Sequence, residues 1–366
     1  MTRPTVAIID LKALRANFAL VKSLAPEASI IPMVKANAYG HGMVEVCRAL
    51  SQSAPAFGVA SIDEALVLRE AGIKQPILLL EGTFSSDEVE IAAANNFMLM
   101  VENSAQKDAI INASISNPVS VWLGVDTGMH RLGFQPQEAT QTYLALSNTD
   151  NVAKPIVAAS HFACADDLGS SATKKQMAIF DRWITTLKPT AGDVIAESLA
   201  NSAAILAWSE THRDWQRPGY MLYGNSPFSE GQDNANKLQP VMSLQSAVIS
   251  VRHIESGESV GYTANWTAGR DSIIATITVG YGDGYPRQAP NGTPVLVNGE
   301  RCPLVGRVSM DMITVDVTDL NPVSIGDKVI LWGPELSVNE IAEYCNTIGY
   351  ELLTRMPSRV PRVYSN

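Results

Sequence analysis

Several features that would mark a specialised class of protein are scarce in this chain of 366 residues. It contains four cysteines, Cys47, Cys164, Cys302 and Cys345, and no two of them form a Cys-x-x-Cys pair. No apolar run approaches the ~20 residues that a membrane-spanning helix needs. We therefore expect no structural zinc site, no other metal site, no disulfide framework and no membrane span, and we expect buried, unreactive thiols.

Positive charge is also in short supply. The chain has 27 lysines and arginines against 37 acidic residues, a formal net charge of −10. This balance argues against nucleic acid or an anionic membrane as the main partner, although a small anionic ligand needs only a local positive site. The first residues show no basic leader followed by an apolar segment, so we expect a cytoplasmic protein. Its 46% apolar content is that of an ordinary globular chain.

Up to about residue 225, short apolar runs alternate with helical patterns. Asp10 and Ser61 are expected to cap two of the helices, Ser61 through a capping box with Glu64. Eight strands alternating with helices fit a (β/α)₈ barrel of the α/β class. A doubly wound sheet fits almost as well, because the pattern does not show closure. The expected strands are residues 30–35, 56–60, 77–80, 97–101, 119–125, 156–161, 194–198 and 220–223.

After about Gln232 the pattern changes to β-branched runs separated by glycine and proline. Asn298-Gly299 predicts a tight hairpin, and Ser337 predicts the start of a late helix. We therefore predict a barrel domain at residues 1–232 and a mostly β C-terminal domain at 233–366. The expected strands of the second domain are residues 241–251, 271–279, 294–297, 304–308 and 312–317.

Lys35 ends an apolar run and is followed at once by Ala-Asn-Ala-Tyr-Gly-His-Gly. In a barrel, the residues just past each strand converge on one face, and Lys35, His161 and Asn201 all fall at such positions. A lysine placed there can lose its proton and act as a nucleophile toward a carbonyl compound. A surface lysine at a strand end explains this segment equally well.

Four further segments of the first domain carry candidate site residues. Arg131, in a glycine-rich loop after a strand, offers a rigid guanidinium to an anion, or is simply solvated. His161 suits a hydrogen-bonding group behind a ligand, or an ordinary strand end. Asn201 and Ser202 at a strand-to-helix junction suit a phosphate site, or a helix cap. Arg217, locked before a proline, needs a partner if it is buried.

The second domain adds three residues in glycine-flanked turns. Tyr262 lies in Val-Gly-Tyr, Tyr281 in Gly-Tyr-Gly-Asp-Gly-Tyr-Pro-Arg, and Met310 in Gly-Arg-Val-Ser-Met-Asp. Taken one at a time, these segments are typical of residues that shape β turns.

Taken together, the segments resemble those of the alanine racemases. The shared motifs are Val-Lys-Ala-Asn-Ala-Tyr-Gly-His-Gly, Asp-Thr-Gly-Met-x-Arg-Leu-Gly, Ala-Asn-Ser-Ala, Arg-Pro-Gly-x-x-Leu-Tyr-Gly, Val-Gly-Tyr and Gly-Arg-x-Ser-Met-Asp. They occur in the family's order, from Ile8 to the Arg359-Val360-Pro361 tail. The resemblance implies an N-terminal (β/α)₈ barrel, a C-terminal β domain, pyridoxal 5′-phosphate (PLP) as cofactor and a homodimer with shared active sites.

The resemblance also implies a reaction with two bases, the interconversion of L-alanine and D-alanine that supplies D-alanine for peptidoglycan. Lys35 would bind PLP covalently and act as the base toward D-alanine. Tyr262 of the partner subunit would be the base toward L-alanine. Arg131 would contact the phenolic oxygen of PLP and the substrate carboxylate. Met310 of the partner subunit would contact substrate, and Tyr281 would line the entrance.

The remaining implied roles hold the cofactor in place. Arg217 would face the pyridine nitrogen of PLP, with His161 behind it. Because arginine does not readily give up a proton, that nitrogen would stay unprotonated. The residues implied at the phosphate are Tyr39, Ser202 and the backbone of Gly219 and Tyr220, and Asn201 is a further candidate for binding the cofactor.

Two positions depart from the family pattern. Some members carry a carbamylated lysine two positions before Asp-Thr-Gly, where it orients the arginine, but this chain has Gly124 there. Some members have a phosphate-contacting tyrosine immediately before Arg-Val-Pro, where this chain has Ser358. Arg131 must therefore be held in another way. Tyr364 is out of register for the missing tyrosine.

Three other functions remain to be weighed. A broad-specificity amino acid racemase is the hardest to separate, although chains of that kind are usually exported. A barrel-type PLP-dependent amino acid decarboxylase needs an acidic group at the pyridine nitrogen, so Arg217 weighs against it. A PLP-binding homeostasis protein is a single barrel, and the second domain with Tyr262 and Met310 weighs against that.

Overall fold

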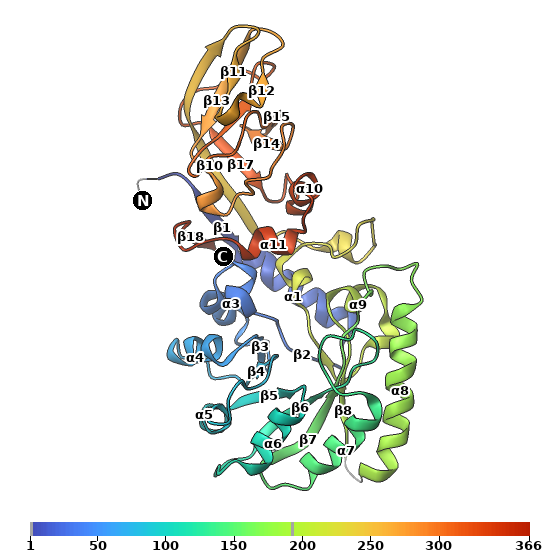
Figure 1. The fold of residues 1–366 in the computed structure, drawn as a ribbon. Helices are drawn as coiled ribbons and strands as arrows, with labels where there is room; N and C mark the ends of the chain where they lie inside the picture. Colours follow the sequence, from blue (N-terminus) through green and yellow to red (C-terminus); the bar gives the residue numbers. More distant parts are fainter. Residues whose placement is uncertain (1–2, 192–193) are drawn as a thin grey trace.

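The computed structural model describes residues 3–191 and 194–366. Its lower part in Figure 1 is a set of parallel strands surrounded by helices, and a mostly β domain stands above it. Both chain ends lie near the junction of the two parts.

The barrel is built from a six-stranded parallel sheet and a parallel pair. β3 to β8 follow one another in sequence order, and β2 pairs with β9. A parallel bridge between Met33 and Gly58 joins the pair to β3, and the Arg217 amide donates to the Ala200 carbonyl just past β8 at 3.0 Å. These contacts close the ring. The strands are β2 (Ser29–Ile30), β3 (Phe57–Val59), β4 (Ile77–Leu79), β5 (Phe97–Val101), β6 (Val119–Gly124), β7 (Val152–Ala159), β8 (Ala196–Ser198) and β9 (Trp215–Gln216).

Alternate side chains of these strands fill the barrel interior as a separate apolar cluster. Its buried members are Ile31, Met33, Ala56, Leu78, Met98, Met100, Trp122, Val157 and Ala159. The intervening side chains, such as Phe57, Ile77 and Leu99, belong to the larger core that also includes the helices. Two-sided burial explains why the strands are continuous apolar runs in the sequence. The predicted barrel is confirmed.

Helices surround the strands. Oδ1 of Asp10 accepts hydrogen bonds from the amides of Lys12 and Ala13 at 2.8 and 2.9 Å, which caps α1 as predicted. The helices are α1 (Leu11–Leu24), α2 (Lys35–Tyr39), α3 (Met43–Leu50), α4 (Ile62–Glu70), α5 (Glu88–Ala94), α6 (Ser104–Asn112), α7 (Pro136–Ser147), α8 (Ala172–Ala191) and α9 (Ser202–Ala207).

Two of the predicted strands are wrong, and the predicted strand at residues 30–35 is much shorter, because β2 ends at Ile30 and Lys35 begins α2. Residues 220–223 form the 3₁₀ turn η2 (Tyr220–Tyr223), and the eighth barrel strand is β9 instead. All four side chains of η2 are buried, so the segment shows the continuous apolar run of a buried strand without being one. Residues 304–308 contribute one bridge, Leu304 to Val315, and the hairpin partner of β14 (Pro294–Val297) is β15 (Glu300–Pro303).

The second domain is a sheet in the order β15-β14-β17-β10-β1-β18, with β13 and β16 joined to β10 and a separate β11–β12 pair. Asn298 and Gly299 have φ of 51° and 86°, so the predicted hairpin turn between β14 and β15 is confirmed. The elements are β10 (Met242–Ile254), β11 (Ser259–Val260), β12 (Trp266–Thr267), β13 (Ser272–Ile277), β14 (Pro294–Val297), β15 (Glu300–Pro303), β16 (Ile313–Asp316), β17 (Lys328–Trp332), α10 (Val338–Tyr344), α11 (Gly349–Thr354) and β18 (Arg362–Ser365).

The first strand, β1 (Val6–Asp10), belongs to this second sheet. It pairs antiparallel with β10 and parallel with β18, with Ile8 opposite Val363. The boundaries 1–232 and 233–366 stay a prediction. The pairing adds that the start of the chain lies in the sheet of the second domain, which the residue pattern did not indicate.

Candidate active site

Lys35 begins an unusual turn where β2 leads to the mouth of the barrel. The four residues that follow it, Ala36, Asn37, Ala38 and Tyr39, have φ of 52°, 53°, 55° and 51°. Each is therefore in the left-handed region, which costs an L-residue about 1–2 kcal/mol. Four such residues in a row persist only where surrounding contacts fix them, and strain of this kind concentrates at functional sites.

Glu64 holds the start of this turn. Its carboxylate accepts hydrogen bonds from the amides of Ala36 at 2.7 Å and Ala60 at 2.8 Å. The predicted capping box is wrong, because Ser61 makes no side-chain cap and Glu64 is used here instead. A carboxylate at the start of α4 thus fixes the backbone next to Lys35.

His41 holds the end of the turn. Its Nδ1 lies 3.0 Å from the Ala38 carbonyl oxygen and 2.9 Å from that of Tyr39, so this nitrogen carries the proton and donates. The fully buried ring stacks on Tyr223 with centroids 4.5 Å apart. Burial lowers the pKa of His41 to about 4, and the imidazole is neutral.

The Lys35 amine lies among charged groups at the barrel mouth. Burial lowers its pKa, and the positive charges of Arg131 and Arg217 lower it further, while Glu81 and Glu64 act in the opposite direction. A lysine whose charged form is disfavoured gives up its proton more readily than a free lysine does. The neutral amine is the state that a nucleophile or a base requires.

Arg217 is buried beside Lys35 and is held by backbone carbonyls. Nη1 donates to the Ser198 carbonyl at 3.0 Å, and Nη2 donates to Leu199 at 3.2 Å and to the Ser160 carbonyl. Burial lowers the pKa of Arg217 to about 10, partly offset by Glu102, so the guanidinium stays charged at neutral pH. The partner that a buried arginine needs is thus supplied mainly by strand-end carbonyls.

His161 lies next to this guanidinium, with Nδ1 3.5 Å from Nη2 of Arg217. The residue is exposed to solvent in this structure, although protein atoms are dense around its ring. Desolvation, together with the charges of Arg217, Arg131 and Lys35, lowers the pKa of His161 to about 3. The neutral imidazole can accept a hydrogen bond from arginine without adding a further positive charge.

At the N-terminus of α9, two backbone amides donate hydrogen bonds to a side-chain hydroxyl. Oγ of Ser202 accepts from the amides of Gly219 at 2.9 Å and Met221 at 3.3 Å. Oδ1 of Asn201 caps the helix by accepting from Ala204 at 3.1 Å. A Cβ atom on Gly219 would lie 2.5 Å from the Tyr39 hydroxyl, so glycine is required for this phenol to approach. The phenol of Tyr220 is turned away and donates to Oδ1 of Asn339.

The second-domain candidates lie apart from this group within one chain. Tyr262 begins the 3₁₀ turn η4 (Tyr262–Ala264) after β11, and Figure 1 shows β11 and β12 at the end of the domain farthest from the barrel. The side chains of Tyr262, Met310 and Tyr281 are 70%, 53% and 39% exposed. The structure therefore brings Lys35, Arg131, His161 and Arg217 together and leaves these three residues on the surface.

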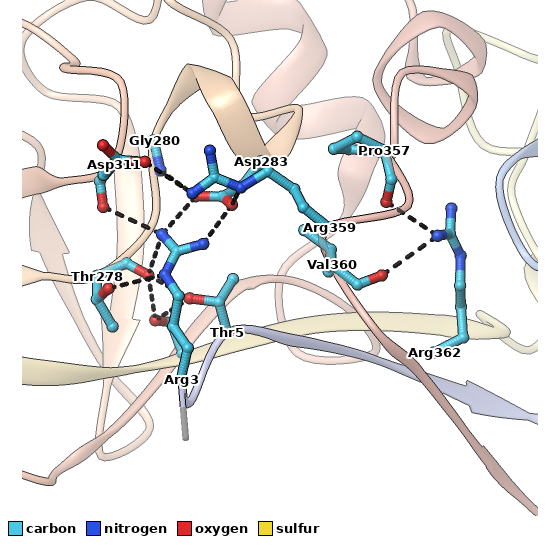
Figure 2. A network of polar contacts seen from close by, with 11 residues as sticks. Arg3, Thr5, Thr278, Gly280, Asp283, Asp311, Pro357, Arg359, Val360 and Arg362 are labelled. Atoms are coloured by element: carbon cyan, nitrogen blue, oxygen red, sulfur yellow. Dashed lines mark hydrogen bonds and ion pairs between the residues drawn. The ribbon is translucent and has the colours of Figure 1, made fainter. Parts of the chain in front are cut away.

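A network of charges fixes the loops that carry Tyr281 and Met310 (Figure 2). Asp283 is fully buried, and both of its carboxylate oxygens accept hydrogen bonds from Arg3. It also forms an ion pair with Nε of Arg359 at 3.0 Å. Arg359 also pairs with Asp311 at 2.7 Å. Alongside, the Gly282 amide donates to the Met310 carbonyl at 2.9 Å, so the two loops are joined through their backbones as well.

Comparison with known proteins covers the chain from end to end. The model of the alanine racemase N-terminal domain matches residues 9–227, and that of the C-terminal domain matches residues 241–364. The chain belongs to the alanine racemase family. Alanine racemase of Vibrio atlanticus is 47% identical over 362 residues, 99% of each chain. The "Alanine racemase, biosynthetic" of Escherichia coli O6:H1 is 48% identical over 358 residues, 98% of each.

Solved structures agree. Biosynthetic alanine racemase from Pseudomonas aeruginosa superposes with a TM-score of 0.94 at 45% identity and covers 100% of both chains. The fold, a TIM-like barrel followed by a mostly β domain, and the enzyme class, an isomerase that racemises alanine, are therefore those of alanine racemase.

Two acidic residues of this alanine racemase fold were missed by reasoning from the sequence. Glu81 follows β4 and its charge acts on Lys35; Glu102 follows β5 and lies near Arg131 and Arg217. Both occupy the strand-end positions that singled out Lys35 and His161, so the same rule would have found them. No three His, Cys, Asp or Glu side chains of residues 3–191 and 194–366 are grouped to hold a metal.

Proposed function

We propose that the chain interconverts L-alanine and D-alanine with PLP, using Lys35 of one subunit and Tyr262 of the partner subunit as the two bases. The observation that carries the proposal is the Lys35 amine, whose pKa is lowered among Arg131, Arg217 and His161 at the mouth of a barrel. Removing a proton from one face of Cα and returning one to the other needs two groups on opposite sides.

The residues present suit PLP. Its aldehyde would find an amine in Lys35, and its phosphate would find the hydroxyl of Ser202, the phenol of Tyr39 and the backbone of Gly219 and Tyr220. Asn201 and Tyr220 would support this region through the helix cap and the backbone. When bound, PLP supplies an electron sink for the charge left when Cα loses its proton.

Charged side chains would set the orientation of PLP and of the substrate. Arg217 would donate a hydrogen bond toward the pyridine nitrogen without transferring its proton, because its pKa of about 10 keeps it cationic. His161 would support Arg217 as a neutral acceptor. Arg131 would pair with the substrate carboxylate, since a guanidinium matches the geometry of that group.

We also propose a homodimer in which the second domain of one copy reaches the barrel mouth of the other. Tyr262 and Met310 are exposed and lie outside the site of their own chain. At the mouth, a cleft of about 510 Å³ is flanked by the exposed apolar side chains of Phe84 and Leu132. Exposed apolar groups at both places support an interface between two copies. Met310 would then contact the substrate and Tyr281 would line the entrance.

The physiological part of the proposal is the supply of D-alanine for peptidoglycan in the cytoplasm. The relatives from E. coli and P. aeruginosa carry the description biosynthetic. All four cysteines are free thiols, as is usual in a reducing compartment. In the described part of the chain, no helix has the length and apolarity to cross a bilayer.

Two substitutions test the proposed bases. Lys35→Ala should abolish both the absorbance of bound PLP and racemisation, and retained activity would refute the role of Lys35. Tyr262→Phe should slow exchange of the α-proton of L-alanine in D₂O far more than that of D-alanine, as measured by NMR. Equal loss with both enantiomers would refute the assignment of faces.

The range of substrates needs a separate assay. Racemisation should be measured with L-alanine, L-serine, L-lysine and L-arginine, together with release of CO₂. We expect activity with alanine to exceed the others by at least about tenfold. Comparable rates with the basic amino acids would favour a broad-specificity racemase, and CO₂ release would favour a decarboxylase.

A further inference from the structure

A carboxylate that the roles above leave unused lies among the cations of the barrel mouth. Glu102 follows β5, and its carboxyl group lies against the backbone of Gly124, the last residue of the neighbouring strand β6. A Cβ atom on Gly124 would overlap Oε2 of Glu102 and lie 2.6 Å from its carboxyl carbon. In this side-chain conformation, the Glu102 carboxylate occupies the space that a Cβ atom at position 124 would take.

Burial disfavours the charged form of Glu102, whereas two nearby arginines favour it. Burial raises the pKa of Glu102 to about 7 and Asp126 acts in the same direction, while Arg217 and Arg131 oppose both. Arg217 already donates to three backbone carbonyls. Among the residues that the structure describes, Arg131 makes no hydrogen bond or ion pair, and the Glu102 carboxylate accepts no hydrogen bond. The Glu102 carboxyl group and the Arg131 guanidinium therefore both lack a partner within the described part of the chain, and they lie close enough for the arginine to lower the pKa of the carboxyl group.

Both backbones are already anchored, so only the two side chains remain to be fixed. The loop before Arg131 is held by Asp126, which accepts from the amides of Gly128 at 2.9 Å and His130 at 3.1 Å. The Glu102 amide donates to Oε1 of Gln106 at 2.8 Å. The proposed hydrogen bond between the side chains would therefore join two segments whose backbones are already held.

We propose that Glu102 is a positioning residue that orients the Arg131 guanidinium toward the substrate carboxylate through a charge-assisted hydrogen bond. This role explains how Arg131 is held in a chain that has glycine at position 124, where some members of the family carry a carbamylated lysine. The Glu102 carboxylate belongs to the chain itself and needs no carbamylation by carbon dioxide. The inference rests on the substrate-binding role proposed for Arg131.

The test measures carboxylate binding directly. Propionate, which has the carbon skeleton and carboxylate of alanine but no amine, is titrated into PLP-loaded enzyme by calorimetry. Glu102→Gln keeps the shape and removes the charge, and it should weaken propionate binding by about tenfold or more, the effect of one lost charge-assisted hydrogen bond. Glu102→Asp should recover part of this loss. Glu88→Gln, on a carboxylate that accepts from the Phe84 amide at the cleft rim, should change nothing.

A double variant separates this inference from the proposed role of Arg131. Arg131→Met should weaken propionate binding, and adding Glu102→Gln should then have no further effect. If Arg131→Met has no effect, the substrate role of Arg131 fails. If Arg131→Met weakens binding but Glu102→Gln does not, or if the two effects add, the inference about Glu102 fails while the role of Arg131 stands.

A second variant guards against a purely structural explanation. Glu102→Ala opens space for a small carboxylate beside Gly124. Excess sodium formate should restore alanine turnover in this variant, and sodium chloride at the same ionic strength should not. Recovery with formate alone supports a required anion, whereas no recovery, or equal recovery with chloride, would overturn the requirement for a carboxylate here. The melting temperature of each variant shows whether it has folded.

Discussion

Neutralising Asp283 should destabilise the second domain. This carboxylate is fully buried, and it accepts hydrogen bonds from both terminal nitrogens of Arg3 and from the Gly280 amide at 2.9 Å (Figure 2). It also forms an ion pair with Nε of Arg359 at 3.0 Å. Asp283→Asn keeps the volume but loses the charge and one acceptor oxygen. Two charge-assisted hydrogen bonds at about 1.5–3 kcal/mol each set the upper limit of the loss.

Solvent reduces that limit. The side chains of Arg3 and Arg359 are 31% and 41% exposed, so hydrogen bonds to water can replace part of the interaction that each arginine loses with Asp283. We therefore expect Asp283→Asn to lower the free energy of unfolding by about 3 kcal/mol. Urea denaturation followed by tryptophan fluorescence measures this change. The variant should also raise the KM for alanine, because the network joins the loops of Tyr281 and Met310.

A double-mutant cycle decides whether the ion pair is responsible. Arg3→Met keeps much of the side-chain stem, and its cost combined with Asp283→Asn should be less than the sum of the single costs by about 1–2 kcal/mol. Additive costs, or a loss below about 0.5 kcal/mol for Asp283→Asn, would refute the reasoning, since a surface substitution without partners has an effect of that size.

Three further predictions follow from local features. The fold lowers the pKa of His41 from 6.5 to about 4, so the stability that His41 contributes is complete above pH 6.5 and is lost as the pH falls toward 4. In His41→Gln, the midpoint of urea denaturation should therefore vary less with pH between 6.5 and 4. Gly40→Ala should cost more than about 3 kcal/mol, since φ is 83° and the new Cβ would overlap the Leu353 carbonyl oxygen. Gly299→Ala, at φ 86° with no atom within 4 Å, should cost about 1 kcal/mol, and thermal melting compares the two. Arg217→Lys should retain PLP absorbance but lower kcat by at least about tenfold, because an ammonium cannot reach the carbonyls of Ser198, Leu199 and Ser160 together.

The sequence was sufficient wherever local signals agreed with the tertiary structure. Asp10 caps α1, and Asn298-Gly299 turns a hairpin, because these short motifs determine their own hydrogen bonds. The strand-end rule located Lys35 and His161 because parallel strands bring their carboxyl ends to one face.

Other features depend on contacts distant in sequence. The sequence of Tyr220–Tyr223 resembles that of a strand because all four residues are buried, so apolar and polar residues do not alternate with the period of any one element. Glu64 accepts a hydrogen bond from the Ala36 amide, and forms no capping box with Ser61, because the left-handed turn leaves that amide without another partner in the described chain. Nor could Glu102 be linked to Gly124 before the neighbouring strands β5 and β6 were in register.

The position of β1 between β10 and β18 has a consequence for synthesis of the chain. The strand made first pairs with the strand made last, Ile8 with Val363, so their contact spans nearly the whole sequence. The barrel segment leaves the ribosome early and can form its local strand pairs, but the second sheet stays incomplete until the final residues emerge. In the meantime β1 exposes the edge that β18 later covers. We therefore expect the second domain to limit the folding rate and to be the point at which nascent chains aggregate.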